Sequence, residues 1–289
     1  MLSILIVNWN TRELLLACLH SIFHFPPSRP FEVIVVDNAS KDGSAAAVAE
    51  AFPQVELIES DKNTGYARGN NLAFSRAKGD WLLTLNPDTE VCEATLDKAV
   101  EVLGRNPGCG ALGARQIGPH GDVQRSVRGF PSLRGIVGDL TGISEALPRS
   151  EFGSYQLPDF DYDTEGPAPQ PMGTFLLFRR SALEAVGDPR SPFDESFPIF
   201  FNEVDLLYRM AQAGWPAMYS PAVVIRHRGG ESTKQVRKSM IWESHRSLGR
   251  FFRKHYRTPL NAPLLWLLQF GLSLAAWVRA KGYDAGFRA

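Results

Sequence analysis

The chain has 289 residues, of which 44% are hydrophobic and 21% are charged, and its 31 Lys and Arg side chains balance 31 Asp and Glu side chains. This length and a near-average composition allow a large buried core and exclude disordered, collagen-like and coiled-coil proteins. The neutral balance argues against a protein that coats nucleic acid, so we expect no nucleic-acid partner. Three widely spaced cysteines without CxxC spacing argue against a disulfide framework or a zinc site and fit a reducing compartment.

The N-terminal third of the chain alternates strand and helix patterns. Because a strand pattern begins directly after Met1, we predict no signal peptide and a cytoplasmic protein. Apolar and β-branched runs predict strands over 2–7, 31–36, 55–58 and 81–85, and the segments between them predict helices over 12–23, 44–52 and 66–78. We expect Thr11 to cap the first helix. Such alternation predicts right-handed βαβ units and a largely parallel sheet in an α/β fold.

Beyond residue 116 the pattern changes twice. Residues 116–170 are rich in Gly, Pro and acids and predict a long functional loop. Strand patterns return over 173–178 and 217–227, and helix patterns over 181–186 and 203–213. The last part of the chain is basic and then apolar: eight Lys and Arg residues accompany one acid, Glu243, between Lys234 and Arg257, and no charge occurs over 259–278.

Polar residues fall where the predicted parallel strands end, which is where open α/β sheets bind ligands. They are Asn8, Asn10, Asp37 and Asp88. A carboxylate at the position of Asp88 can hold Mg²⁺ or Mn²⁺, which in turn bridges two phosphates; alternatively it only caps the next helix. Asp37 can accept hydrogen bonds from a base or ribose, or it can form only an Asx-turn. No G-x-G-x-x-G or Walker sequence follows the first strand, which disfavours NAD binding and ATP hydrolysis.

Three further segments carry candidate chemistry. The run 63–71 has two glycines that allow a close backbone approach and an arginine, Arg68, that can neutralise a phosphate; the alternative is turn geometry alone. Acids flanked by large apolar residues occur over 193–197 and 201–206, where they work chemically or simply favour a helix start. His227 ends an apolar strand before a Gly-Gly turn, although a lone histidine is often structural.

In their order along the chain these motifs resemble glycosyltransferase family 2, and within it the rhamnosyltransferase-like branch. The resemblance spans about residues 2–256 and rests on 7–10, 36–40, 63–71, 86–88, 193–195, 202–206 and the run from Ala213 through His227 to Ser232. Residues 121–131 resemble the middle signature of that branch.

The resemblance implies a GT-A fold, with a mixed, largely parallel central sheet flanked by helices and a C-terminal helical tail. It implies a catalytic domain over 1–230, with a nucleotide-sugar-binding half (1–105) and an acceptor half (106–230), followed by a basic and apolar tail over 231–289. It further implies an inverting transfer of a sugar, with rhamnose favoured, from a dTDP- or UDP-linked donor to a hydroxyl of a glycan or lipid-linked acceptor in polysaccharide synthesis. Mg²⁺ or Mn²⁺ is the implied cofactor.

Position by position, the resemblance assigns site residues. Nucleotide-sugar binding falls to Asn8, Asn10, Asp37, Asn63, Gly65, Arg68, Asn71 and Asn86. Metal binding falls to Asp88 and His227, and the acceptor side to Gly173, Asp194 and Glu195. Glu203 takes the place of the catalytic base, with Asp205 also in the catalytic group. The chain departs from the family where Asn202 replaces the first acid of the usual pair, where Glu203 replaces Asp, and where 187–192 lengthens the spacing.

The chemistry of these residue types agrees with such a transfer. A metal and a cation such as Arg68 stabilise the leaving diphosphate, and one carboxylate removes the acceptor proton. One base without a positioned nucleophile predicts a single displacement with inversion. Alternatives are transfer of another hexose, transfer to polyprenyl phosphate, and a non-catalytic sugar-nucleotide-binding protein. A nucleotidyltransferase is disfavoured, because no Gly- and Lys/Arg-rich loop follows the first strand.

The tail predicts a contact with the anionic inner face of the cell membrane. A helix lying in the membrane interface is favoured over one that crosses, because several residues between 259 and 278 suit a spanning helix poorly: Asn261, Pro263, Gln269, Gly271 and Ser273. The alternative is a helix that is apolar all round because it is buried against the catalytic domain.

Overall fold

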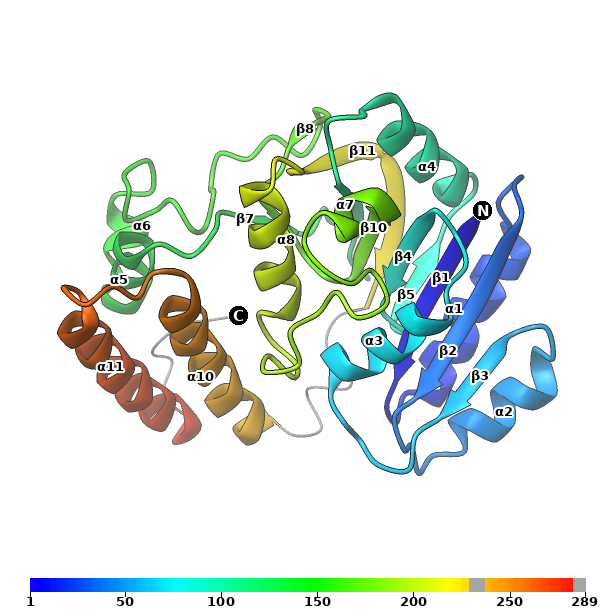
Figure 1. The fold of residues 1–289 in the computed structure, drawn as a ribbon, viewed down its shortest axis with the longest axis horizontal. Helices are drawn as coiled ribbons and strands as arrows, with labels where there is room; N and C mark the ends of the chain where they lie inside the picture. Colours follow the sequence, from blue (N-terminus) through cyan, green and yellow to red (C-terminus); the bar gives the residue numbers. More distant parts are fainter. Residues whose placement is uncertain (229–236, 283–289) are drawn as a thin grey trace.

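A computed structural model describes residues 1–228 and 237–282. Ser232, Lys234 and the expected domain boundary at 230/231 therefore lie outside the described residues. The central feature is one mixed sheet with the strand order β3-β2-β1-β4-β10-β6-β11-β5, in which β8 also pairs with β11 (Figure 1). Its strands are β1 (Leu2–Asn8), β2 (Phe31–Asp37), β3 (Glu56–Glu59), β4 (Trp81–Leu85), β5 (Thr89–Val91), β6 (Ala111–Ile117), β8 (Gly166–Pro167), β10 (Phe175–Arg179) and β11 (Ala217–His227).

The sheet is mostly parallel, because β3, β2, β1 and β4 run side by side in the same direction and β6 and β11 form a further parallel pair. β10 is antiparallel to both of its neighbours, β4 and β6. This reversal brings the start of β10 beside the end of β4, so the residues just before β10 reach the edge where the parallel strands end.

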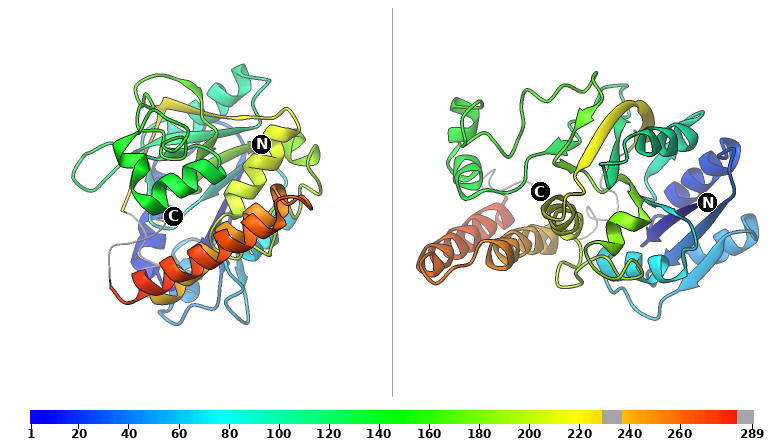
Figure 2. Two further views of the ribbon diagram at one scale, coloured as in Figure 1. Left: turned by 90° about the vertical axis from the view of Figure 1, so that its left-hand side faces the viewer. Right: turned by 45° about the horizontal axis from the view of Figure 1, so that its top comes forward.

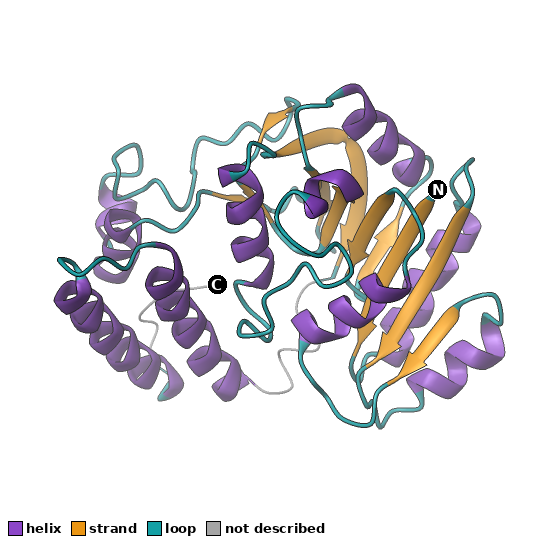
Figure 3. Cartoon of the chain, in the orientation of Figure 1, coloured by secondary structure: helices purple, strands orange, loops and turns teal. Residues whose placement is uncertain are grey.

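Helices cover both faces of the sheet (Figure 3). Alternating residues of β1 show the division: Ile4 and Ile6 pack with α1 (Arg12–His24), whereas Leu5 and Val7 pack with α3 (Tyr66–Arg76). The first face also carries α2 (Ser44–Ala51) and α4 (Thr95–Arg105), and the second carries α7 (Arg180–Glu184) and α8 (Asn202–Gln212). Because both faces are covered, the central strands read as continuous apolar runs.

The last two helices form a hairpin outside the sheet. The two views of Figure 2 agree that α10 (Arg237–His255) and α11 (Ala262–Ala280) lie side by side, at the end of the molecule farthest from β3. Phe251 and Phe252 of α10 form a third apolar cluster with Phe201 and Val204 at the start of α8. Ile136 of α5 (Leu133–Thr141) joins the same cluster, and α6 (Ile143–Ala146) follows α5.

The expected α/β class, with a mixed, mostly parallel sheet and a helical tail, is confirmed. The four expected N-terminal strands and the expected strand over 217–227 match the observed ones to within a residue or two. Sequence patterns missed β5, α4 and β6. Residues 118–170 are mostly irregular, and besides α5, α6 and β8 they hold β7 (Val127–Arg128) and the start of β9 (Gln170–Pro171).

Two local expectations are wrong. Thr11 does not cap α1 through its side chain, because its hydroxyl donates to Asn8 Oδ1 at 2.7 Å. Asp88 does not cap a helix either, since the strand β5 follows it directly and α4 begins only at Thr95. In both cases the side chain is directed toward the strand ends.

Candidate active site

The ends of β1 and β2 form one interlocked polar cluster. Asn8 and Asp37 are register partners, and both are almost fully buried. Asn8 Nδ2 donates to Asp37 Oδ1 at 3.3 Å and to Ser40 Oγ at 3.1 Å. Asp37 also accepts a bond from the Ser40 amide, as in the Asx-turn alternative.

The two loops that follow these strands are held against each other. The amide of Asn10 donates to Ser40 Oγ at 2.9 Å, and Asn10 Oδ1 accepts from the Lys41 amide at 2.7 Å. Asn10 and Ala39 both have left-handed backbone, with φ of 52° and 62°. Non-glycine residues hold this conformation only where the surroundings impose it, often at a functional site. The cluster is a preformed surface at the carboxyl ends of the strands.

Asp88 and His227 lie together because β11 pairs with β5, which places His227 opposite Thr89. His227 Nε2 is 3.6 Å from Asp88 Oδ2, and both side chains are buried. Gln124 holds the histidine twice: its Nε2 donates to the His227 carbonyl at 3.2 Å, and its Oε1 lies 2.8 Å from His227 Nδ1. Because an amide oxygen only accepts, Nδ1 carries a proton, and a neutral imidazole in this tautomer presents the lone pair of Nε2 on the side of Asp88.

This pair fits a divalent cation that a diphosphate completes. In the part of the chain that the structure describes, no group of three or more His, Cys, Asp and Glu side chains is placed to hold an ion by itself. Mg²⁺ sites at phosphates commonly use only one or two protein carboxylates together with substrate oxygens. The hydrogen bond that Gln124 forms with the far ring nitrogen is the kind of support that orients ligating histidines.

Glu203 reaches the same edge of the sheet from α8. A Cβ built on Gly173 would lie 3.5 Å from Glu203 Cγ, an ordinary van der Waals contact, so Gly173 and the Glu203 side chain are direct neighbours. The chain from Gly173 continues to Thr174, whose carbonyl accepts from the Asn86 amide at 3.0 Å. Tyr66, whose hydroxyl lies 3.3 Å from the Gly173 carbonyl, feels the negative charge of both Glu203 and Asp88, and burial together with these charges raises its pKa. Glu203, Asn86 and Asp88 therefore lie in one region, around Tyr66 and the segment from Gly173 to Thr174.

Burial raises the pKa of Glu203 from 4.5 to about 7, opposed only in part by its own backbone amide. Glu203 stands in the first turn of α8, two residues after Phe201, which has a left-handed φ of 67°. Asn202 is fully buried and donates to the Ile199 carbonyl at 2.6 Å. An ionised acid at position 202 has no proton to donate there, so the amide suits this turn and the departure at 202 has a structural reason.

Asp205 faces away from Glu203, toward the tail. It is fully buried and contacts two cations and a histidine: Arg209 Nε at 2.9 Å, Lys254 Nζ at 2.6 Å and His255 Nε2 at 2.7 Å. Burial alone would raise its pKa, but the hydrogen bonds from His255 and Lys254 and the charge of Arg209 lower it. Asp205 thus ties the helix that carries Glu203 to α10.

The segment around α3 places the remaining residues of the nucleotide group. Gly65 has φ of +88°, and a Cβ there would come within 2.6 Å of the Pro198 carbonyl, so only glycine fits. Asn63 Oδ1 accepts from Asn38 Nδ2 and from the Gly65 amide, both at 3.0 Å. Asn71 Nδ2 donates to the Phe193 carbonyl at 2.9 Å, and Asn71 Oδ1 accepts from the Phe193 amide at 3.0 Å.

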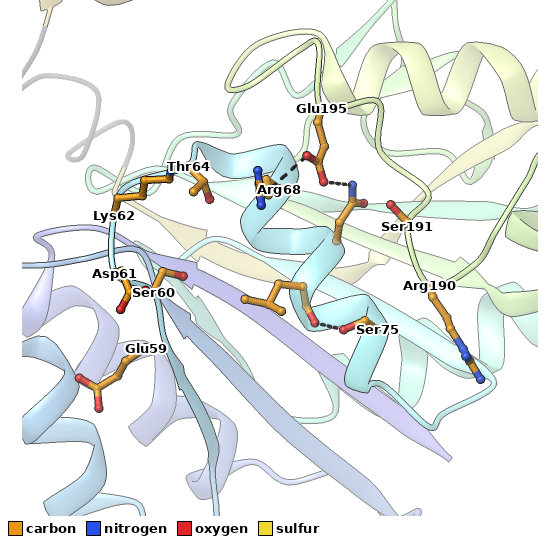
Figure 4. Close-up of a pocket in the computed structure, with 12 residues that line it drawn as sticks. Glu59, Ser60, Asp61, Lys62, Thr64, Arg68, Ser75, Arg190, Ser191 and Glu195 are labelled. Atoms are coloured by element: carbon orange, nitrogen blue, oxygen red, sulfur yellow. Dashed lines mark hydrogen bonds and ion pairs between the residues drawn. The ribbon is translucent and has the colours of Figure 1, made fainter.

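Beside α3 lies a hollow of about 480 Å³ (Figure 4). Arg68 and Glu195 point toward each other there with 3.9 Å between Nε and Oε2, whereas Glu59 and Arg190 lie far from this pair. Arg68 remains 61% exposed, so its guanidinium is available to an anion. Asp194 instead contacts Lys254 Nζ at 2.7 Å, and this hydrogen bond overcomes burial and lowers the Asp194 pKa to about 2.

The structure therefore brings Asn8, Asn10 and Asp37 together in one group, and Asn86, Asp88, His227, Gly173 and Glu203 in a second group at the same sheet edge. Asn71, Asp194 and Asp205 are occupied by contacts within the protein. Sequence reasoning did not single out Gln124, Tyr66 or Lys254 for the site. Gln124 and Tyr66 fall inside segments 121–131 and 63–71, which carried the family resemblance, so those segments were the available signal.

Comparisons with known proteins agree with this fold. The family described as Glycosyl transferase family 2 matches residues 3–187. N-acetylglucosaminyl-diphospho-decaprenol L-rhamnosyltransferase of Mycobacterium tuberculosis is 30% identical over 265 residues, which are 88% of this chain and 84% of that protein.

Two solved structures share the fold. The mannosyltransferase PcManGT from Pyrobaculum calidifontis, in complex with GDP-Man and Mn²⁺, has a TM-score of 0.59 at 21% identity and covers 98% of this chain and 76% of its own. S. aureus TarS 1–349 in complex with UDP has a TM-score of 0.53 at 17% identity, over 95% of this chain and 80% of its own. The architecture is that of a GT-A glycosyltransferase, and the chain belongs to glycosyltransferase family 2.

Proposed function

We propose that this protein is an inverting glycosyltransferase that moves a sugar, with rhamnose favoured, from a dTDP- or UDP-linked donor to a hydroxyl of a glycan or lipid-linked acceptor in cell-surface polysaccharide synthesis. The observation that carries the proposal is Glu203, a buried carboxyl group whose pKa is raised to about 7. Its charge and that of Asp88, the partner of His227, both act on the Tyr66 hydroxyl. The activity for which the mycobacterial relative is named supports rhamnose and a lipid-linked acceptor. The GDP-Man and UDP complexes of the structural relatives support a nucleotide-bound donor.

On the donor side, Asn8, Asn10, Asp37 and Asn63 form the surface for the nucleoside, with Gly65, Asn71 and Asn86 shaping its walls. Asp88 and His227 would hold Mg²⁺ or Mn²⁺, which when bound supplies positive charge beside the leaving diphosphate. Arg68 adds a second positive charge from the helix α3. We assign this binding to the half over 1–105 and acceptor binding to the half over 106–230.

On the acceptor side, Glu203 accepts the proton of the attacking hydroxyl at a carboxylate oxygen. The acceptor's hydroxyl oxygen bonds to the anomeric carbon while the bond from this carbon to the diphosphate oxygen breaks, so the configuration inverts. Gly173 lies beside Glu203, and we assign it to the acceptor side together with Asp194 and Glu195. We assign Asp205 to positioning α8, because its carboxylate is already paired with Arg209, Lys254 and His255.

Thermal-shift measurements with dTDP-rhamnose, UDP-sugars and GDP-mannose, each with and without Mn²⁺, test the donor. We expect one nucleotide sugar plus metal to raise the melting temperature, since a ligand of the folded state stabilises it by mass action. In Asp88→Ala the metal-dependent part of the shift disappears. An unchanged metal-dependent shift in this variant would remove Asp88 from the metal site.

The anomeric configuration of the product distinguishes an inverting from a retaining transfer. With the preferred donor and a lipid-linked glycan, NMR of the new linkage should show the anomeric configuration opposite to that of the donor. Retention of configuration would contradict the single displacement. Donor binding without hydrolysis or transfer would favour a non-catalytic binding protein.

A further inference from the structure

One face of α11 is an exposed apolar stripe. Its five members recur at helical spacing and are between 52% and 78% exposed: Trp266, Leu267, Phe270, Leu274 and Trp277. The opposite face is buried by Leu265, Leu272 and Ala276. By length and composition the helix could cross a membrane, yet only 17% of its most apolar 18-residue stretch is buried within the protein. A helix that is apolar all round because it is buried therefore does not describe α11.

The hairpin fixes where this stripe points. A Cβ on Gly249 of α10 would lie 2.0 Å from Gln269 Oε1, so the two helices approach closely at this glycine. Arg253 of α10 donates to the same Gln269 oxygen at 2.9 Å. Gln269 of α11 thus faces α10, and the apolar stripe faces away. This is the arrangement of a helix that lies along a surface rather than of one that crosses a bilayer alone.

The net positive charge of the segment that carries the stripe indicates which partner the stripe binds. The segment 237–282 contains nine Lys and Arg residues and one acid, Glu243, whereas the whole chain is formally neutral. The rest of the chain is consequently as negative as this segment is positive. Arg246, Arg253 and Arg257 are exposed, and Lys281 Nζ lies 5.7 Å from the ring centre of Trp277, at the end of the stripe.

These features favour lipid over a second copy of the chain. Two copies that met through the stripe would bring two strongly cationic segments together, whereas anionic headgroups neutralise them. Tryptophan beside lysine is also the residue pair that settles at the boundary between headgroups and acyl chains.

We propose that α11 lies flat in the interface of an anionic bilayer, with the stripe among the upper acyl chains and the exposed cations of the hairpin on lipid phosphates. Lys254 and His255 of α10 contact Asp205 of α8, two residues beyond Glu203. Docking therefore sets the orientation of the site relative to the bilayer. This inference goes beyond the proposed transfer and does not depend on the sugar.

Sedimentation of the full chain with vesicles of phosphatidylcholine, alone or mixed with phosphatidylglycerol, tests the proposal. We expect binding that requires phosphatidylglycerol and weakens in salt. The double variant Trp266→Glu/Phe270→Glu should lower the partition coefficient at least tenfold. Arg257→Gln and Lys281→Gln should each lower it about fivefold on mixed vesicles. Leu147→Glu, at a 55% exposed leucine near α6, is the matched control and should bind as wild type does.

Three outcomes would overturn the proposal. They are wild-type binding by the Trp266→Glu/Phe270→Glu variant, absence of binding by the wild type, and a dimer in light scattering that this variant converts to a monomer. The donor-induced thermal shift, measured in parallel, should be unchanged in the tail variants. It shows that they are folded, and it separates a failure of docking from a failure of the proposed transfer.

Discussion

The donor side and the base side of the site are built in different ways. Asn8, Asp37 and Ser40 form hydrogen bonds with one another at the ends of two neighbouring strands. Their positions therefore depend on one edge of the sheet only. Glu203 depends on distant parts of the chain: Gly173 lies beside it, and Asp205 anchors its helix to α10. Changes on the donor side should therefore act locally, whereas changes on the base side should combine chemistry with stability.

The largest effect is expected for Glu203→Gln. Loss of a general base lowers turnover by roughly two to four orders of magnitude, while donor binding should persist because the donor residues lie on other elements. Steady-state transfer assays together with donor titrations measure the two effects separately. If Asp205→Asn proved the more damaging to turnover at equal folded protein, the base would be two positions further along the chain.

The pH profile sharpens the same assignment. Because the Glu203 pKa is raised to about 7, the base is ionised only above that pH, so kcat/KM should rise through about pH 7. The Glu203→Gln variant should lack this limb in its residual activity. A wild-type profile that is flat from pH 5 to 8 would exclude Glu203 as the titrating base.

Asp205→Asn should affect stability more than chemistry. Removing the charge leaves Lys254 and Arg209 beside a neutral amide, and breaking a buried ion pair costs about 3 kcal/mol. Urea unfolding measures this loss, and KM for the donor should stay close to wild type. The matched control is Asp163→Asn, whose carboxylate pairs with Arg115 but is 80% exposed and should contribute little.

Gln124→Leu tests the support of the metal ligand. Without the bond to Nδ1, His227 loses its fixed tautomer, and Mn²⁺ affinity in the presence of nucleotide should fall about tenfold to a hundredfold. Titration calorimetry gives the affinity, and Gln124→Glu, which still accepts from Nδ1, should restore much of it. Equal affinity in Gln124→Leu would leave this residue with a structural role only.

The smallest effect concerns acid stability. The Asp194 pKa is lowered to about 2, so the carboxylate stabilises the fold above its ordinary pKa and this contribution disappears as the pH falls from about 4 toward 2. Because both partners are about one third exposed, we expect about 1 kcal/mol or less. Asp194→Asn should flatten the difference in unfolding free energy between pH 6 and pH 3. A wild-type slope in the variant would contradict the assignment.

The sequence by itself determined the class of fold and the strand-end residues. Apolar runs of five to seven residues alternating with helical patterns specify parallel βαβ units, and a polar residue after each run must then lie at the carboxyl edge, as Asn8, Asp37 and Asp88 do. The family motifs added His227 and Glu203. The strand-end positions of Asn8, Asp37 and Asp88 are local features, so spacing along the chain is enough to predict them.

Only the tertiary structure decided which side chains meet. Gln124 reaches His227 across 103 positions, and His255 reaches Asp205 across 50. No periodicity encodes such contacts, because they arise where a strand pairing or a helix crossing brings remote segments together. The same holds for α11: its composition is apolar throughout, and only its packing on α10 through Gly249 decides which residues are buried and which form the exposed stripe.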